Sequence, residues 1–142
     1  MHQDLGRDLF LNYVAEVGVL EGAARHDIKS LSTWMKDVPE DVELLLAPGA
    51  AFTRQEPMGT VAIIGSWNAP FVTTIKPLIS AISAGNCAIV KPSEHSPKSA
   101  AVIKKMVEKL DPDCFVCFEG GIDVAVAINK LPLDLICFTG ST

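Results

Sequence analysis

The first residue whose chemistry suggests a reaction is an asparagine that follows an apolar run. Asn68 lies shortly after the run at residues 61–64. Its side-chain amide can donate a hydrogen bond to a negative charge that develops on a substrate oxygen. An asparagine before Ala69 and Pro70 is also common in turns, and a tryptophan such as the neighbouring Trp67 is more often a core residue than a ligand contact. By itself this pair is a weak indication of catalysis.

Two charged residues follow the next apolar run, at residues 87–90. Lys91 can donate and Glu94 can accept hydrogen bonds, which suits the hydroxyl groups of a ribose. A carboxylate at this place also disfavours a 2′-phosphate, because like charges repel. An ordinary polar loop between a strand and a helix has the same composition, so spacing alone leaves both interpretations open.

A small polar turn follows the last apolar run, at residues 135–138. In Gly140, Ser141 and Thr142, backbone N–H groups and a hydroxyl could receive a pyrophosphate at the start of a helix. A simple capping turn is the alternative. The sequence contains neither G-x-G-x-x-G nor G-x-x-x-x-G-K, so glycine spacing does not predict nucleotide binding.

The four cysteines do not form a site in this interpretation. Cys114 and Cys117 form a C-x-x-C pair. In an extended strand, however, such side chains leave from opposite faces about 10 Å apart, so neither a disulfide nor shared metal ligation fits. Cys87 and Cys137 lie in comparable apolar runs. We therefore predict no activated nucleophile and, since the histidines show no ligand spacing, no metal site.

Four short apolar runs must position these residues. They lie at residues 61–64, 87–90, 114–118 and 135–138, and their nearly all-apolar composition predicts strands covered on both faces. They begin at residues 61, 87, 114 and 135, and gaps of about 20 residues or more leave room for a crossover helix each time but are too long for hairpins. Between them, apolar residues recur at helical spacing in 75–82, 103–110 and 124–128, and Ser96-Pro97 is suited to begin the second helix. This alternation predicts an α/β fold with a doubly wound, Rossmann-like parallel sheet, truncated after its fourth strand. Ligands of such sheets bind at the carboxyl ends of the strands.

The first third of the chain predicts a helix and an arm. Apolar residues recur every three or four positions from Val17 to Met35, which predicts one amphipathic helix that Pro39 ends. Residues 41–57 are irregular and predict a peripheral arm or hairpin with a short strand at 52–56. We therefore divide the chain into N-terminal helices and an arm at 1–57 and a partial dinucleotide-binding domain at 58–142.

Composition excludes several classes of function. A net charge of -5 and a pI of about 5.1 argue against a nucleic-acid partner. No apolar run is long enough to indicate a membrane span, and cysteines placed in apolar runs favour a reducing, cytoplasmic compartment. The mean hydropathy of +0.30 is high for a complete soluble domain. Because no helix follows the fourth strand, we expect a piece of a longer protein.

Five ordered motifs make the chain resemble the aldehyde dehydrogenase superfamily, closest to its class 3 branch. The resemblance extends from about Asp4 to the last residue and corresponds to the N-terminal portion of such an enzyme. The motifs are Glu56-Pro57-Met58-Gly59, Gly65-Ser66-Trp67-Asn68-Ala69-Pro70, Ala84-Gly85-Asn86, Lys91-Pro92-Ser93-Glu94 and Phe138-Thr139-Gly140-Ser141-Thr142.

The resemblance implies oxidation of an aldehyde to a carboxylic acid through a cysteine thiohemiacetal, with NAD or NADP as cofactor and a homodimer as the intact enzyme. The nucleophilic cysteine and the glutamate that activates water belong to segments outside this chain, so we expect the chain alone to be inactive. The resemblance implies that Asn68 stabilises the oxyanion, that Lys91, Ser93 and Glu94 hold the adenosine ribose, that Ser66 and Trp67 line the cofactor cleft, and that Gly140 and Ser141 meet the pyrophosphate.

One position departs from the family pattern. Ala69 stands where a bulky aromatic residue is usual, which implies a wider or reshaped aldehyde pocket. Two other functions are open: a non-catalytic nucleotide-binding or dimerising module, and a related acyl-phosphate or semialdehyde reductase. The pair of Trp67 and Asn68 favours the dehydrogenase over the reductase.

Overall fold

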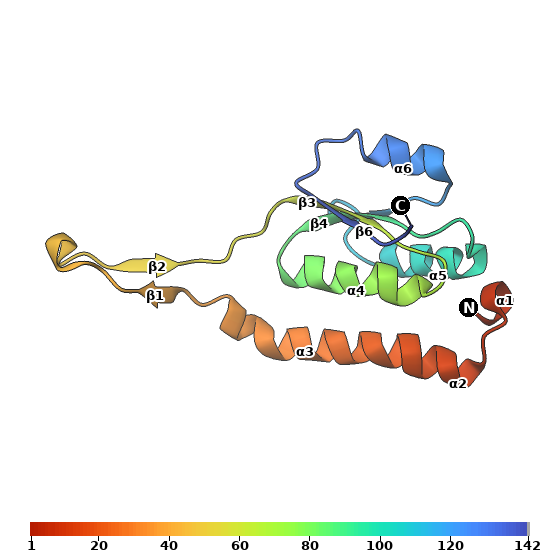
Figure 1. Ribbon diagram of the computed structural model, residues 1–142, viewed down its shortest axis with the longest axis horizontal. Helices are drawn as coiled ribbons and strands as arrows, with labels where there is room; N and C mark the ends of the chain where they lie inside the picture. Colours follow the sequence, from red (N-terminus) through yellow and green to blue (C-terminus); the bar gives the residue numbers. More distant parts are fainter. Residues whose placement is uncertain (142) are drawn as a thin grey trace.

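The computed structural model describes residues 1–141, and its centre is a parallel sheet of four strands. These are β3 (Thr60–Ile64), β4 (Cys87–Lys91), β5 (Phe115–Cys117) and β6 (Leu135–Phe138). Their order across the sheet is β5-β4-β3-β6 (Figure 1). Valine and isoleucine are frequent in these strands because branched side chains pack well on a pleated surface. Every neighbouring pair is parallel, as the spacing of the apolar runs predicts.

Three helices connect the strands and cover both faces. Helices α4 (Pro70–Ser83) and α5 (Pro97–Val107) lie on one face, and α6 (Ile122–Ile128) lies on the other (Figure 1). The chain moves outward from β3 to β4 and β5 and then crosses to β6 on the opposite side of β3. The doubly wound fold is therefore confirmed. Ligands of such folds bind where the strand order reverses, which is here beside β3.

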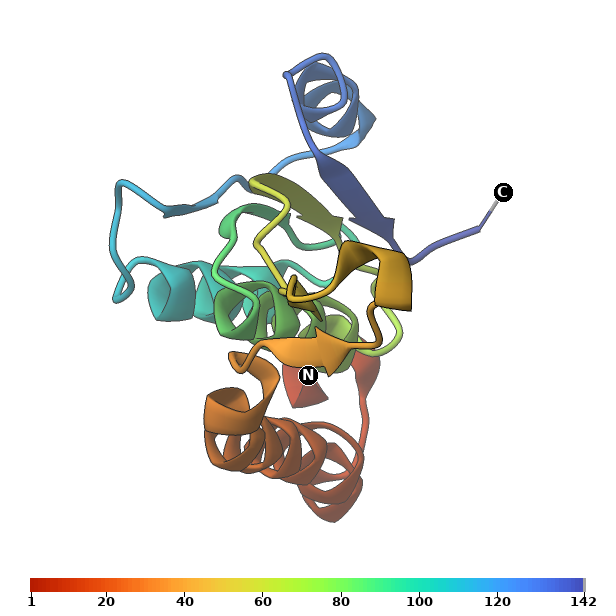
Figure 2. The same cartoon turned by 90° about the vertical axis from the view of Figure 1, so that its left-hand side faces the viewer.

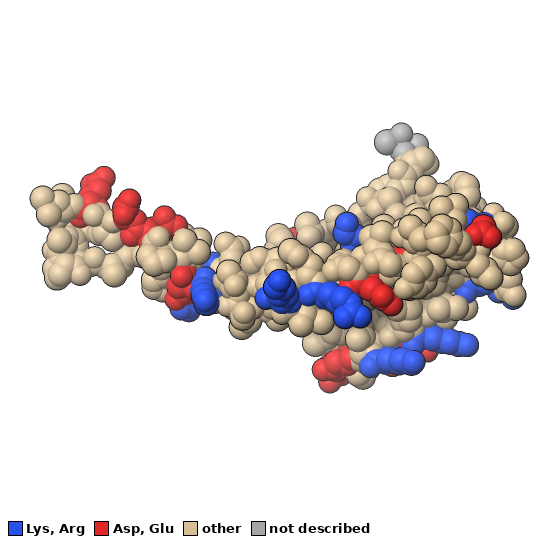
Figure 3. All heavy atoms as spheres, turned by 90° about the horizontal axis from the view of Figure 1, so that it is seen from below, with Lys and Arg blue, Asp and Glu red and all other residues tan. Residues whose placement is uncertain are grey.

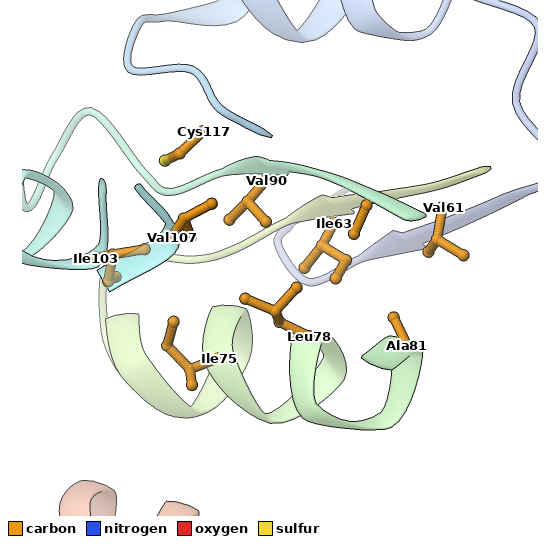
Figure 4. Packing of buried hydrophobic residues seen from close by; sticks show 10 residues of the cluster. Val61, Ile63, Ile75, Leu78, Ala81, Val90, Ile103, Val107 and Cys117 are labelled. Atoms are coloured by element: carbon orange, nitrogen blue, oxygen red, sulfur yellow. The ribbon is translucent and has the colours of Figure 1, made fainter. Parts of the chain in front are cut away.

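The core fills the space between the sheet and the two helices on its α4 face (Figure 4). Ile63 and Val90 from the strands pack with Leu78 from α4 and with Ile103 and Val107 from α5, and each of the five is at most 3% exposed. Burial of such a side chain stabilises the fold by about 1.5–3 kcal/mol. This packing fixes the strands whose ends carry the polar residues.

An outer layer of N-terminal helices packs against α4, on the side away from the sheet (Figure 2). The predicted long helix is present, but it ends at Trp34 rather than at Pro39, which lies in the following strand, and its apolar stripe is only partly buried. Leu20 packs against the core, whereas Ile28 and Met35 are 77% and 73% exposed. The layer consists of α1 (His2–Leu5), α2 (Leu9–Asn12), a π-helical turn at Tyr13–Val17 and α3 (Gly18–Trp34).

The predicted arm is a hairpin that projects from the body (Figures 1 and 3). Strand β1 (Val38–Glu40) pairs antiparallel with β2 (Ala51–Thr53), and a 3₁₀ turn at Leu44–Leu46 forms the tip. The three leucines of the tip are 92%, 90% and 64% exposed. The second strand is thus shorter and earlier than the one expected at residues 52–56.

The sheet also corrects two expectations about the strands. The third strand begins at Phe115 rather than at Cys114, which lies in the preceding turn, and it ends at Cys117 rather than at residue 118. The apolar runs suggested strands covered on both faces. In β6, however, Leu135 and Phe138 are 44% and 60% exposed, because β6 is an edge strand of the described sheet.

Helix α5 begins where the sequence predicts, but a distant residue caps it. Ser96 is the residue before the helix, yet its hydroxyl donates to the Ser93 carbonyl oxygen at 3.5 Å and does not cap the helix. The Asp4 carboxylate accepts hydrogen bonds from the backbone N–H groups of Lys98 and Ser99, at 3.1 and 2.8 Å. The N-terminal segment therefore anchors to the sheet domain through this carboxylate.

Candidate functional site

The eight residues that the sequence singles out line one cleft. It has a volume of about 640 Å³ and lies at the carboxyl ends of β3, β4 and β6, beside the reversal of strand order. Thr142, the last residue of the final turn, lies outside the described residues. The cleft residues are Ser66, Trp67 and Asn68 after β3, Lys91, Ser93 and Glu94 at and after the end of β4, and Gly140 and Ser141 after β6.

The amide of Asn68 has a defined orientation. Its Oδ1 accepts a hydrogen bond from the Ser66 hydroxyl at 2.6 Å, so the Nδ2 group keeps its N–H donors for another partner. The backbone N–H of Ser66 donates to Thr73 Oγ1 at 3.1 Å, and that hydroxyl donates to the Ala69 carbonyl oxygen at 2.9 Å. The loop is therefore braced from α4, and an exposed asparagine presents a donor in a fixed direction.

The loop after β3 lies unusually close to α4. A Cβ atom added to Gly65 would stand 2.0 Å from Thr74 Oγ1, a distance that side chains do not tolerate. The Gly65 N–H donates to the Lys91 carbonyl oxygen at 3.0 Å, which ties the loop to β4 as well. Glycine is needed at this position because only a missing side chain allows the approach.

Lys91 and Glu94 form an ion pair at the end of β4. The Lys91 side chain is 4% exposed, and its ammonium lies 3.1 Å from Glu94 Oε2 and 3.3 Å from the Pro92 carbonyl oxygen. The pKa of Glu94 is lowered, first by a hydrogen bond from its own backbone N–H and then by Lys91, and these effects outweigh burial. Glu94 is therefore ionised at neutral pH, and the ion pair offers both a donor and an acceptor toward the cleft.

Trp67 is not a core residue. Its side chain is 52% exposed and belongs to the cleft lining, which corrects the more common interpretation of a tryptophan in this position. His95 also lines the cleft, and its backbone N–H donates to Ser93 Oγ at 3.3 Å. An aromatic ring exposed in a cleft can bind a planar ligand group by stacking.

The turn after β6 completes the cleft. The Thr139 N–H donates to the Ile64 carbonyl oxygen at 3.0 Å, which extends the pairing of β6 with β3. A Cβ atom at Gly140 would stand 2.6 Å from the Phe138 ring, so glycine lets the chain pass over that ring. Gly140 and Ser141 of this turn line the cleft.

Sequence reasoning missed some residues of the cleft and of the contacts that support it. Thr73 is a bracing residue, and its signal was a hydroxyl in the first turn of the helix that follows the strand. Ile122 and Ala125 line the cleft from α6 on the opposite face of the sheet. No local pattern connects α6 with the loop after β3, because the two approach each other only when the crossover through α6 places β6 beside β3.

The cysteines lie outside the cleft lining. Burial, together with the nearby Glu119, raises the pKa of Cys117 to about 12, and the neighbouring Cys87 thiol raises the pKa of Cys114. Neither thiol is therefore activated as a nucleophile. Within residues 1–141 there is no group of three or more His, Cys, Asp or Glu side chains that could hold a metal ion. No helix in the described part of the chain has the length and apolar character needed to cross a bilayer.

Comparisons with known proteins agree on one family. Residues 11–142 match the family described as the aldehyde dehydrogenase family. The chain is 39% identical over 142 residues to 4,4′-diaponeurosporen-aldehyde dehydrogenase of Staphylococcus aureus, a match that covers 99% of this chain and 31% of that protein. It is 40% identical over 139 residues to mouse aldehyde dehydrogenase family 3 member B3, which covers 97% of this chain and 29% of that protein.

Solved structures show the same relationship. The substrate-bound state of Staphylococcus aureus AldH matches with a TM-score of 0.96 at 39% identity, over 99% of this chain and 31% of that one. Succinic semialdehyde dehydrogenase from Streptococcus pyogenes, in complex with NADP+, shares the fold with a TM-score of 0.78 at 16% identity, over 95% of this chain and 29% of that one. The chain thus spans about three tenths of the length of these relatives.

Proposed function

The chain belongs to the aldehyde dehydrogenase family, and from this premise we propose that the protein to which it contributes oxidises an aldehyde to a carboxylic acid with NAD or NADP. Since the chain spans about 31% of a relative's length, the reaction is a property of the longer protein. One observation carries the proposal: the amide donor of Asn68 and the ion pair of Lys91 and Glu94 line the same cleft.

The residues of the cleft fit a nicotinamide dinucleotide. The Lys91 ammonium uses two contacts within the protein, which leaves a third N–H for a ribose hydroxyl, and Glu94 retains an oxygen that can accept from the same diol. Ser93 lies between them, and Ser66 and Trp67 line the cleft nearby. Gly140 and Ser141 supply backbone N–H groups suited to a pyrophosphate. When bound, the cofactor would supply the oxidant that accepts a hydride from the substrate carbon.

Asn68 would act on the aldehyde. A nucleophile that adds to the aldehyde carbon converts the carbonyl oxygen to an oxyanion, and an amide N–H aimed at that oxygen stabilises the charge. Because Ser66 holds Oδ1, the amide does not need to rotate before it donates. Preorganised donors are effective because no reorganisation is needed as the charge forms.

The family resemblance assigns the nucleophile to a cysteine and the activation of water to a glutamate, both outside this chain. The described cysteines do not replace that cysteine: Cys137 lies within β6, paired with Ile63, and Cys117 is buried with a raised pKa. The chain on its own is therefore expected to form no NADH from an aldehyde. Turnover by purified material of this length would contradict the assignment.

The arm supports a proposal about assembly. Its tip exposes Leu44–Leu46 on a hairpin that stands away from the body, and exposed apolar side chains at such a site favour a protein contact. We propose a homodimer for the intact enzyme. We also propose a cytoplasmic location, because the cysteines lie in apolar runs. The net charge of -5 argues against a nucleic-acid partner. Sedimentation of the complete protein as a monomer would refute the dimer.

The test is the activity of the complete protein and of its Asn68→Ala variant. We expect aldehyde-dependent formation of reduced cofactor, slowed about 100-fold or more in kcat by Asn68→Ala with nearly unchanged cofactor KM, as for loss of one oxyanion donor. Asn129→Ala is the matched control, because this asparagine is exposed at the end of α6 and outside the cleft.

Other outcomes would identify the alternatives. Faster reduction of an acyl phosphate than oxidation of the aldehyde would support the reductase. Cofactor binding without any turnover would support a non-catalytic nucleotide-binding or dimerising module. An equal loss of cofactor binding in Asn68→Ala would show that its role is misassigned.

A further inference from the structure

We propose that Arg7 and Glu16 are positioning residues that hold the loop of Asn68 in its donor geometry. This inference rests on the proposed function of Asn68. Both residues lie in the N-terminal segment, in or before the π-helical turn, and neither belongs to the five motifs of the sequence. Arg7 reaches the loop after β3 at Asn68, 61 positions along the chain, and Glu16 reaches the start of α4 at Phe71, 55 positions along the chain.

Glu16 holds the start of α4. The residue is 0% exposed, and its Oε2 accepts hydrogen bonds from the backbone N–H groups of Phe71 and Val72 at 2.8 and 3.3 Å. These groups belong to the first turn of α4, where Ala69 precedes the helix and provides no capping side chain. A buried carboxylate requires such partners, and the helix N-terminus favours its negative charge. Glu16 therefore fixes the helix end to which the Asn68 loop is attached.

Arg7 connects this carboxylate to Asn68 itself. Its Nη1 lies 2.6 Å from Glu16 Oε1, and its Nη2 donates to the backbone carbonyl oxygen of Asn68. The planar guanidinium can hold both acceptors at once, which a lysine ammonium on a flexible stem does less well. The Arg7 backbone is fixed in turn, because its carbonyl oxygen accepts from the side chain of Asn12 at 3.2 Å.

Asn68 is thus held at two points. Arg7 fixes the backbone carbonyl, and Ser66 fixes the side-chain oxygen at 2.6 Å. The remaining side-chain N–H groups have a direction set by both contacts. Misplacement of a reacting or stabilising group by about 1 Å can slow a reaction about 100-fold, so a contact that never touches substrate can still control the rate.

A second buried carboxylate provides a matched comparison. Asp4 caps α5 as Glu16 caps α4, from the same N-terminal segment, with a side chain that is 3% exposed. Asp4 contacts Ser99 and Lys98 and makes no hydrogen bond to the loop of Asn68 in the described residues. Loss of Asp4 should therefore lower stability only, whereas loss of the pair of Arg7 and Glu16 should also lower the rate.

The experiment is a double-mutant cycle on the complete protein with Arg7→Met, Asn68→Ala and the double variant. We expect Arg7→Met to lower kcat about 10-fold or more with cofactor KM changed less than about 2-fold. In the Asn68→Ala background the same substitution should lower kcat by less than about 2-fold, because residues that act through one another are not additive. Glu16→Gln is expected to follow Arg7→Met.

Asp4→Asn is the control, and it should lower the unfolding temperature with kcat unchanged. Equal losses of kcat from Arg7→Met in both backgrounds, or no loss in either, would overturn the positioning role while the dehydrogenase function stands. An Asn68→Ala variant with full kcat would instead overturn the proposed function of Asn68. If Arg7→Met does not fold, Arg7→Lys replaces it in the same cycle, with an intermediate loss expected.

Discussion

Substitution of Gly65 by alanine tests the close approach of the loop to α4. The new Cβ would stand 2.0 Å from Thr74 Oγ1 and 3.2 Å from Thr74 Cβ, whereas contacts under 3.0 Å are essentially never seen. The loop or the helix must therefore move by about 1 Å. Overpacking of this kind destabilises a protein by about 1–3 kcal/mol, and the same displacement moves Asn68, so kcat should fall about 100-fold.

The destabilisation by Gly65→Ala depends on the Thr74 hydroxyl, so a second substitution that removes this hydroxyl should compensate for it. Thr74 is 0% exposed, and its Oγ1 has no hydrogen-bond partner among the described residues, so its removal sacrifices no such bond. Thr74→Ala removes the atom at 2.0 Å and leaves a Cβ contact of 3.2 Å, which small shifts can relieve. Gly65→Ala combined with Thr74→Ala should thus be more stable than the sum of the single losses, by about 1–2 kcal/mol.

The assay is urea unfolding of the purified variants, with kcat measured in parallel. Gly22→Ala is the matched control: a Cβ at Gly22, within α3, meets nothing within 4 Å. That substitution should raise the free energy of unfolding by up to about 1 kcal/mol, because alanine is the better helix former. Strict additivity of Gly65→Ala and Thr74→Ala would refute the steric argument, and so would a Gly65→Ala protein as stable as the Gly22→Ala protein.

Two further predictions concern carboxylates. Burial raises the pKa of Asp4, but hydrogen bonds from Ser99 and Lys98 outweigh burial, so the pKa is lowered. The ionised Asp4 therefore stabilises the folded protein above its ordinary pKa of 3.8. This stabilisation is lost as the pH falls through the lowered pKa of the folded state. Asp4→Asn should therefore lower the unfolding temperature at pH 7 but by progressively less below about pH 4, and a penalty independent of pH would contradict this. Glu94→Gln should weaken NAD binding about 10- to 100-fold, as for loss of a hydrogen bond to a charged group, and should weaken NADP binding less because a like-charge repulsion is removed. Titration of both cofactors measures this, and equal losses for the two would argue against a ribose contact.

Much of the fold follows from local patterns. The apolar runs and the helical spacing between them predicted the four strands to within a few residues at each end, because period and turn chemistry act over a few neighbouring positions. The parallel sheet followed from the length of the connections. Since the polar residues stand at strand ends, a single edge of the sheet had to collect them, and the cleft contains all eight.

What the local pattern left open was decided by contacts between distant residues. The sequence suggested Ser96 as the N-terminal cap of α5, but the Asp4 carboxylate accepts the backbone hydrogen bonds at that helix end. At the start of α4 the Glu16 carboxylate accepts them, because Ala69 has no capping side chain. The local sequence favoured a core position for Trp67, whereas in the folded chain this residue is exposed at the cleft. The period of an amphipathic helix likewise did not reveal that Ile28 remains exposed.

The sequence by itself therefore determined the α/β alternation, the edge at which the site forms and the residue types that line it, because each of these depends on short-range spacing. Only the tertiary structure decided which way the Asn68 amide points, since that direction depends on Ser66 and Thr73. It alone brought Arg7 to the Asn68 backbone. A hydrogen bond across 61 positions leaves no periodic trace in the chain, because its formation depends on how whole helices pack.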